Sequence, residues 1–508
     1  KKMVTRVTNQ AQQANSLQNI FRITENLFKA QQEIATGKRI NRPSDDPAGM
    51  RDALLLRTGV NRANQFIRNI DNNRIFIQAG DTSLQSINLN LIRAKELAVS
   101  ELGGASTAET RGFAASELDE IISQVFGTAN TKVKNQFIFS GTNFRVQPFS
   151  AEASGAVYLG NSESFQVGVA NNISIDFSIP GSQVLAADLD PQITSSTLVS
   201  SLNGGAGITP GSISVSDRAG NTATISVSST DTIGGLISKI NSAGVNVTAS
   251  INSSGNGLQL VDNNTVITQS MTVSEVSGGS TATELGIFGK RDGTLSGSDL
   301  NPVMTTSTLI SNLEGGNGLT LNDINIVNGA ASGTVTLSSA TTMGDVINLI
   351  NNAGLNVTAS INSAGNSLQI TSTNSSTVAV VRNVGTDETA ESLGLGGGKN
   401  IFTTLFKLRD AFQKDDTSAI LASLDTLDSS LASVNNSRAI IGASLSRVDN
   451  SNFVHAQEMV YRSEQLSKIE DADIIKSASD LANLEFALQA TLGATAQILQ
   501  PTLLDFLR

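Results

Sequence analysis

"LRTGVNRANQFIRNIDNNRIFIQAGDTSLQSINLNLIRAKELA", residues 56–98, has an apolar side chain at every seventh position. The seven positions are Leu56, Ala63, Ile70, Ile77, Leu84, Leu91 and Ala98. A spacing of seven places these side chains along one face of an α-helix, as in coiled coils. The stretch therefore predicts a long helix that lies along another helix.

Three further segments carry similar apolar stripes. In residues 424–448 the stripe is broken at Arg438, and its members are Leu424, Leu427, Leu431, Val434, Ile441, Leu445 and Val448. Shorter stripes consist of Ile20, Leu27 and Ile34, and of Leu481, Leu484, Leu488 and Leu492. These patterns fit two arrangements: a self-contained helical bundle, or helices that pack along those of other subunits.

The two ends of the chain favour packing against other subunits. Residues 1–30 combine an amphipathic stripe with many Asn and Gln residues, which is poor material for an independent core. The last ten residues, QPTLLDFLR with the preceding Leu, contain an apolar cluster that needs a partner to cover it: Leu503, Leu504, Phe506 and Leu507. We expect residues 1–50 and 456–508 to be assembly helices that order on association, residues 1–50 being disordered in the free subunit.

Composition divides the chain into three regions. Residues 1–145 and 401–508 are rich in Asn, Gln, Ala, Leu and Ile, whereas residues 146–400 are rich in Ser, Thr, Gly, Asn and Val. Residues 151–400 hold 18 acidic and 6 basic side chains, a net charge of −12, against +1 for the rest. We predict a multidomain α plus β protein. Residues 51–145 and 401–455 would form the helical core domain of a long coiled-coil-like bundle, with the strand-rich residues 146–400 inserted and facing outward.

The inserted region contains a repeat. Residues 241–260, NSAGVNVTASINSSGNGLQL, return as residues 351–370, NNAGLNVTASINSAGNSLQI, with 15 of 20 positions identical. The flanking similarity predicts two tandem modules, at about 188–290 and 299–398. Alternating segments such as 212–216 predict strands, and residues 231–241 and 341–351 predict a short amphipathic helix that begins at a Thr or Asp cap.

Composition also excludes most catalytic chemistry. The chain has no Cys and one His, His455, which removes thiol nucleophiles, Cys-ligated metals, His-based triads and the HExxH zinc motif. We expect no enzymatic activity, no metal and no cofactor, and we interpret His455 as a polar residue on a helix. No segment concentrates basic and aromatic residues as nucleic-acid binding requires, and no apolar run is long enough for membrane insertion. The N-terminal residues lack the apolar run of a secretory signal peptide.

Residues 35–49, ATGKRINRPSDDPAG, resemble fragments of a phosphate loop and of a metal site, but they complete neither. No Gly stands five residues before Gly37-Lys38, and Asp45 and Asp46 have no apparent third ligand. The stretch instead predicts a connector between two helices. Gly37 would cap the C-terminus of the first helix, and Asp46 with Pro47 would begin the second. The negative charges of Asp45 and Asp46 would interact favourably with the positive end of the second helix's dipole.

The basic side chains of this connector, Lys38, Arg39 and Arg42, are expected to point outward. They allow two interpretations: a solvated turn, or contacts with a neighbouring subunit. Pro43 and Pro47 prevent the first helix from continuing through this stretch.

Several segments resemble bacterial flagellin and its relatives. They are GKRINRPSDDPAG (37–49), LQSINLNLIRAKELAV (84–99), NQFIFSGTNF (135–144), EDADI (470–474) and the ending LQPTLLDFL. The connector, the FIFSGT segment and the ending are most similar to the family members at the hook–filament junction. The repeated modules resemble the insert known as the flagellin hook motif.

The resemblance implies a structural axial protein of the flagellum that polymerises at the hook–filament junction, outside the cell, after export through the flagellar type III route. Its implied partners are further copies in a ring or tube, the preceding hook-associated junction protein, flagellin, the export apparatus and an export chaperone. The absence of Cys and Trp suits a chain that travels unfolded.

The same resemblance implies which residues take part in assembly. Residues 92–98 are similar to a flagellin segment that contacts neighbouring subunits and is sensed by an innate immune receptor, with Ile92 where flagellins usually carry Gln. The stripes, the connector, the apolar ending and this resemblance together give the expected assembly residues: Ile20, Leu27, Ile34, Gly37, Lys38, Arg39, Ile40, Arg42, Pro43, Asp45, Asp46, Pro47, Gly49, Arg93, Glu96, Leu97, Leu484, Leu488, Ile498, Leu499, Leu503, Leu504, Phe506 and Leu507.

Two alternatives to the junction role stay open at this point. One is the filament flagellin itself. The other, of a different class, is a surface adhesin whose modules bind glycans, although those modules carry few aromatic side chains for stacking on sugars.

Overall fold

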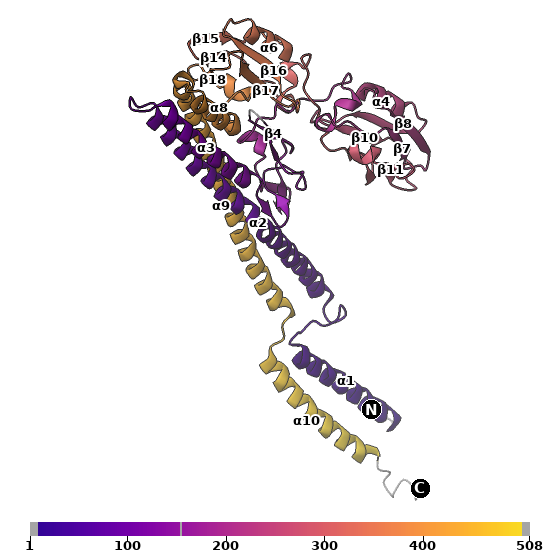
Figure 1. Ribbon diagram of the computed structural model, residues 1–508. Helices are drawn as coiled ribbons and strands as arrows, with labels where there is room; N and C mark the ends of the chain where they lie inside the picture. Colours follow the sequence, from indigo (N-terminus) through magenta and orange to yellow (C-terminus); the bar gives the residue numbers. More distant parts are fainter. Residues whose placement is uncertain (1–8, 153–154, 500–508) are drawn as a thin grey trace, which may run out of the picture. The chain divides into compact units, whose positions relative to one another are not determined.

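The computed structural model describes residues 9–152 and 155–499. Both ends of the chain form long helices, and the small sheets come from the sequence between α3 and α8 (Figure 1). The long helices are α1 Asn9–Thr36, α2 Pro47–Glu101, α3 Ala108–Ala129, α8 Ile401–Gln413, α9 Thr417–Glu470 and α10 Ile474–Leu499. The predicted fold class, a helical bundle with strand-rich insertions, is confirmed. The chain divides into two compact units. Unit 1 is Lys1–Asn72, Gly168–Ile173 and Val448–Arg508, and unit 2 is Asn73–Val167 and Ser174–Arg447.

Unit 1 is built from two antiparallel helix pairs. Helices α1 and α10 lie side by side (Figure 1). The first part of α2 lies along the last part of α9, with Asp71 accepting a hydrogen bond from Asn452 (3.3 Å) and Arg57 reaching Glu470 (2.7 Å). Residues from the two ends of the sequence therefore meet throughout this unit.

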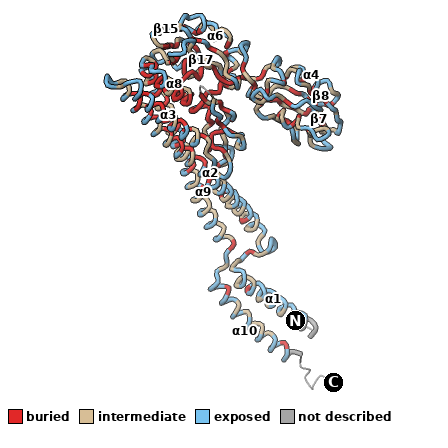
Figure 2. The backbone as a smooth tube through the Cα atoms, viewed as in Figure 1, coloured by how far each residue is buried: buried red, intermediate tan, exposed pale blue. Residues whose placement is uncertain are grey.

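In unit 2 the rest of α2 lies antiparallel to the first part of α9. Their polar edges are joined by Arg438 with Asp81 (3.0 Å) and by Asn88 with Asn435 (3.1 Å). Buried residues recur along both helices in this unit (Figure 2). The heptad positions face inward, and the fully buried ones include Leu84 and Leu91. Burying a Leu side chain contributes roughly 1.5–3 kcal/mol, so this stripe holds the pair together. Arg438, which breaks the stripe in the sequence, lies at its edge in an ion pair.

Helix α3 packs against α8 in the same unit. The rings of Phe126 and Phe402 are 4.1 Å apart between centroids, and Arg409 reaches Asp119 across the pair (3.4 Å). Thr107 caps the N-terminus of α3 in a capping box. Three two-stranded sheets follow: β1 Lys132–Val133 with β2 Gln136–Phe137, β3 Phe149–Glu152 with β4 Gly155–Tyr158, and β5 Gln166–Ala170 with β6 Ile173–Asp176.

Residues 192–302 form the first repeat. Its elements are β7 Gly211–Ser216, β8 Thr222–Val227, α4 Ile233–Asn241, β9 Val247–Ile251, β10 Leu258–Asp262, β11 Met271–Glu275, α5 Thr281–Glu284, β12 Gly289–Arg291 and β13 Thr294–Ser296. The strands make two sheets in the orders β12-β11-β7-β8 and β13-β10-β9. Thr232 caps α4, as the sequence predicts.

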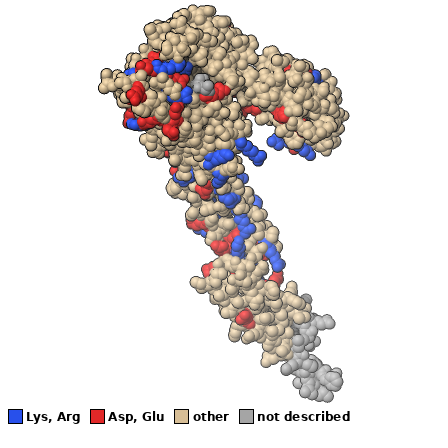
Figure 3. All heavy atoms as spheres, in the orientation of Figure 1, with Lys and Arg blue, Asp and Glu red and all other residues tan. Residues whose placement is uncertain are grey.

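Residues 303–398 form the second repeat. Its elements are β14 Asp323–Asn328, β15 Ala331–Thr336, α6 Met343–Asn351, β16 Val357–Ile361, β17 Leu368–Ser372, β18 Ala379–Asn383 and α7 Thr389–Ser392, with sheets β15-β14-β18 and β16-β17. The repeats share a side-chain contact. The Asn241 side-chain amide donates to the Ala249 carbonyl and accepts the Ala249 N–H, and Asn351 makes the same two bonds with Ala359. Most of the repeat surface seen in Figure 3 is neither acidic nor basic.

The repeat boundaries differ from the expected ones. The predicted end of the first module near residue 290 leaves out β13, which pairs with β10, and Leu300, which is buried in the same core. Leu189, expected to open the first module, is buried in the core of the second. The alternating pattern that predicts the short strands does not show which of the two cores a leucine outside a strand, such as Leu189, belongs to.

Candidate assembly surfaces

Residues 37–46 connect α1 to α2 and lie beside residues 471–473, which connect α9 to α10. Helix α1 ends at Thr36, and Gly37 has a positive φ of 69° while its N–H donates to the Glu33 carbonyl (2.9 Å). A side chain is strained at such a φ, so glycine suits this cap. The Ala472 N–H then donates to the Gly37 carbonyl (2.9 Å), which ties the two connectors together.

The second end of the connector also follows the prediction. Helix α2 begins at Pro47, and the Asp46 carboxylate accepts the Gly49 N–H at 2.9 Å, which satisfies one of the free amides of the helix start. A Cβ at Gly49 would lie 2.6 Å from the Asp46 carboxylate and 2.7 Å from the buried Ile40 side chain. The tight turn therefore needs glycine at this position.

Asp45 has a different role from the one expected. Its carboxylate accepts the N–H groups of Arg42 (2.8 Å) and Asn41 (3.0 Å), so it braces the connector and not the N-terminus of α2. These two backbone hydrogen bonds, first that of Arg42 and then that of Asn41, lower the pKa of Asp45. Pro43 is exposed in the turn that this carboxylate closes.

Two of the three basic side chains of the connector bond to the end of α9. Lys38 lies 3.0 Å from the Glu470 carboxylate, and the Arg39 guanidinium donates to the Ile469 carbonyl (2.9 Å). Arg42 is exposed, as expected. The expectation that all three point outward thus differs from the structure for Lys38, which Glu470 attracts, whereas Arg39 stays exposed while its guanidinium bonds the Ile469 carbonyl.

Glu470 is a central residue of this junction that the sequence reasoning did not select. It is 2% exposed, and its carboxylate binds Arg57 (2.7 Å) as well as Lys38. Burial acts to raise the pKa of Glu470, but the bonds from Arg57 and Lys38 outweigh it and leave the pKa below its ordinary value. The signal was present in EDADI, where an acidic residue stands at the end of a long helix.

The paired helices α1 and α10 are apolar on more than one face. The predicted stripe residues Ile20, Leu27, Ile34, Leu484 and Leu488 are half-buried.

Beside them, large side chains remain exposed on the same two helices. Phe21 is 71% exposed, Phe28 70% and Phe486 75%. We call these three residues the aromatic face. The sequence signal for it was the apolar doublets at residues 20–21 and 27–28.

Part of the predicted assembly set lies at the edge of the described chain. Ile498 and Leu499 belong to the last turn of α10, and Leu503, Leu504, Phe506 and Leu507 lie outside the described residues. Their participation in assembly, and the disorder expected for residues 1–50 in a free subunit, stay predictions.

The segment 92–98 of α2 presents a charged ridge in unit 2. Arg93 binds Glu117 of α3 (2.7 Å) and Glu96 (3.1 Å), while Ile92 is exposed. Leu97 is 7% exposed and therefore faces the core, which is at odds with its expected role as a surface contact. Its neighbour Ala98 belongs to the heptad stripe, and the inward face of the helix is wide enough to include both.

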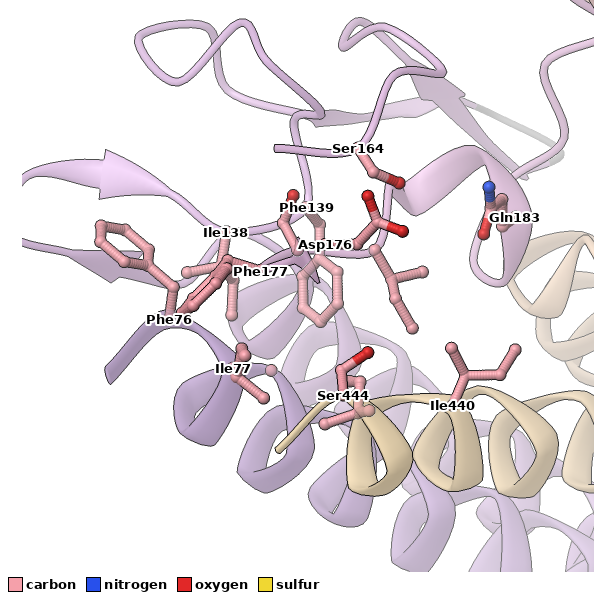
Figure 4. A pocket seen from close by; sticks show the side chains of 14 residues that line it. Phe76, Ile77, Ile138, Phe139, Ser164, Asp176, Phe177, Gln183, Ile440 and Ser444 are labelled. Carbon is pink, nitrogen blue, oxygen red and sulfur yellow. The ribbon is translucent and has the colours of Figure 1, made fainter. Parts of the chain in front are cut away.

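A hollow of about 160 Å³ lies between α2, α9 and the segments around β6 (Figure 4). Phe76, Ile77, Phe139 and Ile440 line it, and Asp176 stands at its wall. Ligand pockets are usually about 300–1,000 Å³ with several converging polar groups. This hollow is smaller than such pockets, and its size gives no support for a cofactor site.

The remaining candidates for chemistry are structural. His455 is buried in α9, where its Nε2 bonds the Val169 carbonyl (2.6 Å) and its ring stacks on Phe66 with centroids 5.0 Å apart. Among the described residues, no three His, Cys, Asp or Glu side chains are grouped to hold a metal ion. Along that same part of the chain, no helix has the length and apolar character needed to cross a bilayer.

Comparison with protein families agrees with this architecture at both ends. The bacterial flagellin N-terminal helical region matches residues 7–144, and the bacterial flagellin C-terminal helical region matches residues 424–507. The flagellin hook IN motif matches twice, at residues 201–264 and 319–374, one copy in each repeat. The chain belongs to the bacterial flagellin family. This flagellin-family subunit thus has both terminal helical regions, and its repeats are hook IN motifs.

Individual relatives match shorter parts of the flagellin-family subunit. The flagellar filament 41 kDa core protein of Borreliella burgdorferi is 32% identical over 22% of this chain and 33% of its own length. The flagellin of Clostridium tyrobutyricum is 27% identical over 32% and 42%, and flagellar hook-associated protein 3 of Escherichia coli is 24% identical over 32% and 50%. The chain thus spans between a third and a half of the length of these curated relatives.

Solved structures of related proteins align over more of the chain. FlgL of Xanthomonas campestris aligns with 81% of this chain and 98% of its own at 14% identity, with a TM-score of 0.37. Hook associated protein-3 of Legionella pneumophila aligns with 82% and 98% at 15% identity, with a TM-score of 0.35.

Proposed function

We propose that this flagellin-family chain is a structural, non-enzymatic subunit of the bacterial flagellum that polymerises at the hook–filament junction, as hook-associated protein 3. The observation that carries the proposal is the aromatic face of α1 and α10. Three phenylalanines that are at least 70% exposed are unfavourable on an isolated subunit, and further copies of the same chain would cover them.

The connector supports this role by fixing the direction of the helices that carry the aromatic face. The caps at Gly37 and Asp46 end one helix and start the next, and Glu470 holds both connectors together. In a polymer every subunit must present the aromatic face in the same direction, and the two linked connectors fix that direction. The motifs GKRINRPSDDP, FIFSGT and LQPTLLDFL favour the junction protein over the filament subunit.

The proposed role defines the partners and the location. The subunit would contact copies of itself in a ring or tube, the preceding hook-associated protein on one side and flagellin on the other. It would reach the flagellum outside the cell through the type III export apparatus, with an export chaperone. The proposed role needs no cofactor, nucleic acid or membrane insertion.

Filament flagellin is the second candidate, because relatives such as that of Clostridium tyrobutyricum carry the name flagellin. A strain that lacks this chain separates the two roles. We expect it to keep its hooks and to release unpolymerised flagellin into the medium, and we expect immunogold labelling of the wild type to mark a short band next to the hook. Label along the whole filament would instead identify the filament subunit.

A further inference from the structure

The two predicted modules begin with similar four-residue segments. Residues 188–191 read DLDP and residues 299–302 read DLNP, at positions 111 apart. We call these segments arm 1 and arm 2. Arm 1 precedes the first repeat, whereas arm 2 ends it. Each arm therefore stands directly before a repeat in the sequence, and the question is which repeat each one completes.

Arm 1 docks on the second repeat. The Leu189 N–H donates to the Asn366 carbonyl (2.8 Å), and the Leu189 carbonyl accepts the Glu314 N–H (2.8 Å). The Asp190 carbonyl accepts the Gly315 N–H (2.9 Å), and the Leu189 side chain is buried in the core of that repeat. Arm 1 is therefore part of a fold whose other residues begin more than a hundred positions later.

Arm 2 docks in the same way on the first repeat. The Leu300 N–H donates to the Asn256 carbonyl (2.8 Å), and the Leu300 carbonyl accepts the Asn203 N–H (2.7 Å). The Asn301 carbonyl accepts the Gly204 N–H (2.8 Å), and Leu300 is buried in the core of the first repeat. Each bond of arm 1 thus has a counterpart in arm 2.

The two arms have the same internal hydrogen bond and the same backbone conformation. In each arm the first Asp accepts the N–H of the third residue, at 3.0 Å from Asp190 to Asp188 and 2.7 Å from Asn301 to Asp299. The third residue has a φ of 39° in both arms, a region in which Asp and Asn are tolerated better than most residues. The proline that follows is buried, and it brings no N–H that would need a partner.

The chain crosses between the repeats directly after each arm. After arm 1 the Gln192 N–H still bonds the second repeat, at the Asn312 carbonyl (2.7 Å), and the Ile193 N–H bonds the first, at Gly255 (2.8 Å). The equivalent bonds at the other crossing run from Val303 to Ser201 (2.9 Å) and from Met304 to Gly365 (2.6 Å).

The two crossings lie beside each other. Pro191 and Gln192 line the same hollow, of about 360 Å³, as their counterparts Pro302 and Val303.

We propose that each repeat carries a docking groove for an Asp-Leu-(Asp/Asn)-Pro segment, and that the first repeat is a removable insert because arm 1 completes the second repeat. Removing residues 192–302 joins Pro191 to Val303 and leaves DLDP in front of the repeat on which it already docks. The chain then no longer crosses between the repeats. The backbone hydrogen bonds of arm 1 to Asn366, Glu314 and Gly315 are kept, because none of these partners lies within residues 192–302. The inserted region of this subunit would then become shorter by one whole repeat, and the second repeat would keep its fold.

Hydrogen exchange of the full-length chain tests the assignment of the arms. Leu189→Ala should accelerate exchange in α6 of the second repeat by about 10-fold or more and leave α4 of the first repeat unchanged, and Leu300→Ala should do the reverse. These matched substitutions remove the same atoms from equivalent positions. An effect of Leu189→Ala on α4 alone, or equal effects on both helices, would overturn the proposal.

Deletion of residues 192–302 from the otherwise full-length chain supplies the second measurement. We expect α6 to keep its wild-type protection within about two-fold, and we expect Leu189→Ala in the deletion variant to accelerate its exchange again. Loss of α6 protection in the deletion variant itself would show that the first repeat is needed by the second, which contradicts a removable insert.

Discussion

Lys38 and Glu470 form an ion pair across 432 positions of sequence, with the Lys38 Nζ 3.0 Å from the carboxylate. The pair joins the end of α1 to the end of α9, and the Arg39 N–H reinforces it by donating to the Glu470 carbonyl (2.6 Å). Glu470 is nearly fully buried while its two cations, Lys38 and Arg57, are each about two-fifths exposed. Removal of the Glu470 carboxylate is therefore expected to destabilise unit 1 more than removal of either cation.

Glu470→Gln should destabilise unit 1 by about 1–2 kcal/mol, because a neutral amide replaces a carboxylate that accepts two charge-assisted bonds, and water partly screens both cations. The Ala472 amide, which donates to Gly37, should exchange faster in the variant. Since the folded-state pKa of Glu470 is lowered, its contribution is present above the ordinary pKa of Glu and is lost as the pH falls through the lowered value.

Glu464→Gln is the matched control for this prediction. Glu464 pairs with Lys468 on the exposed side of the same helix at 2.7 Å, and i,i+4 pairs of this kind contribute roughly 0.3–0.5 kcal/mol. Equal effects of the two substitutions on Ala472 exchange would contradict the role given to Glu470.

Asp46→Ala should destabilise the start of α2 by about 1 kcal/mol, because the Gly49 N–H loses its acceptor, whereas Asp46→Asn should retain most of the stability. Amide exchange at Gly49 reports the change directly. Asp52→Ala, one turn and a half further along the same helix, controls for the loss of a carboxylate. If Asp46→Asn is as damaging as Asp46→Ala, the carboxylate acts through its charge and not as a cap.

The sequence predicted the helical part of this fold well because heptad spacing reflects packing directly. Ile77, Leu84 and Leu91 are buried where the spacing placed them, and Gly37 and Asp46 end and begin helices as their local chemistry requires. Local signals of this kind depend on residues within one or two turns of each other.

What the sequence did not reveal depends on residues far apart in the chain. The contact of Lys38 with Glu470 follows from the antiparallel pairing of α2 with α9, and no spacing rule specifies that register. Leu97 lies only one position from the heptad stripe, which made its burial hard to foresee. Leu189 likewise joins a core formed more than a hundred residues later.

The double substitution Phe21→Ser, Phe28→Ser should leave the folded subunit intact and abolish its polymerisation, because both rings are exposed in the subunit and would be covered between subunits. Electron microscopy of assemblies and circular dichroism of the subunit measure the two properties separately. Asn19→Ser, Asn26→Ser is the control, since these polar residues are exposed on the same helix one position before the stripe. Polymerisation of the phenylalanine variant at the wild-type level would exclude the aromatic face from assembly.

Asp190→Asn should reduce the loss of stability that the second repeat undergoes at alkaline pH. Burial, with repulsion from Asp190, raises the pKa of Asp188 to about 8, and burial, with repulsion from Asp299 and Glu314, raises that of Asp190 to about 7. These carboxyls ionise near 3.8 when unfolded, so the folded state binds more protons and stability falls as the pH rises from about 4 to 8. Lys399, which pairs with Glu314 at 2.9 Å, offsets part of the repulsion.

The substitution copies a residue that the chain already uses, because Asn301 occupies the equivalent position of arm 2 with the same φ of 39°. We expect urea unfolding at pH 5 and pH 9 to show a difference smaller than that of the wild type by on the order of 1–3 kcal/mol. Asp292→Asn, at an exposed turn of the first repeat, should leave the difference unchanged. A wild-type response in Asp190→Asn would mean that the charge on Asp190 does not oppose docking of arm 1, since the variant keeps the backbone geometry and removes that charge alone.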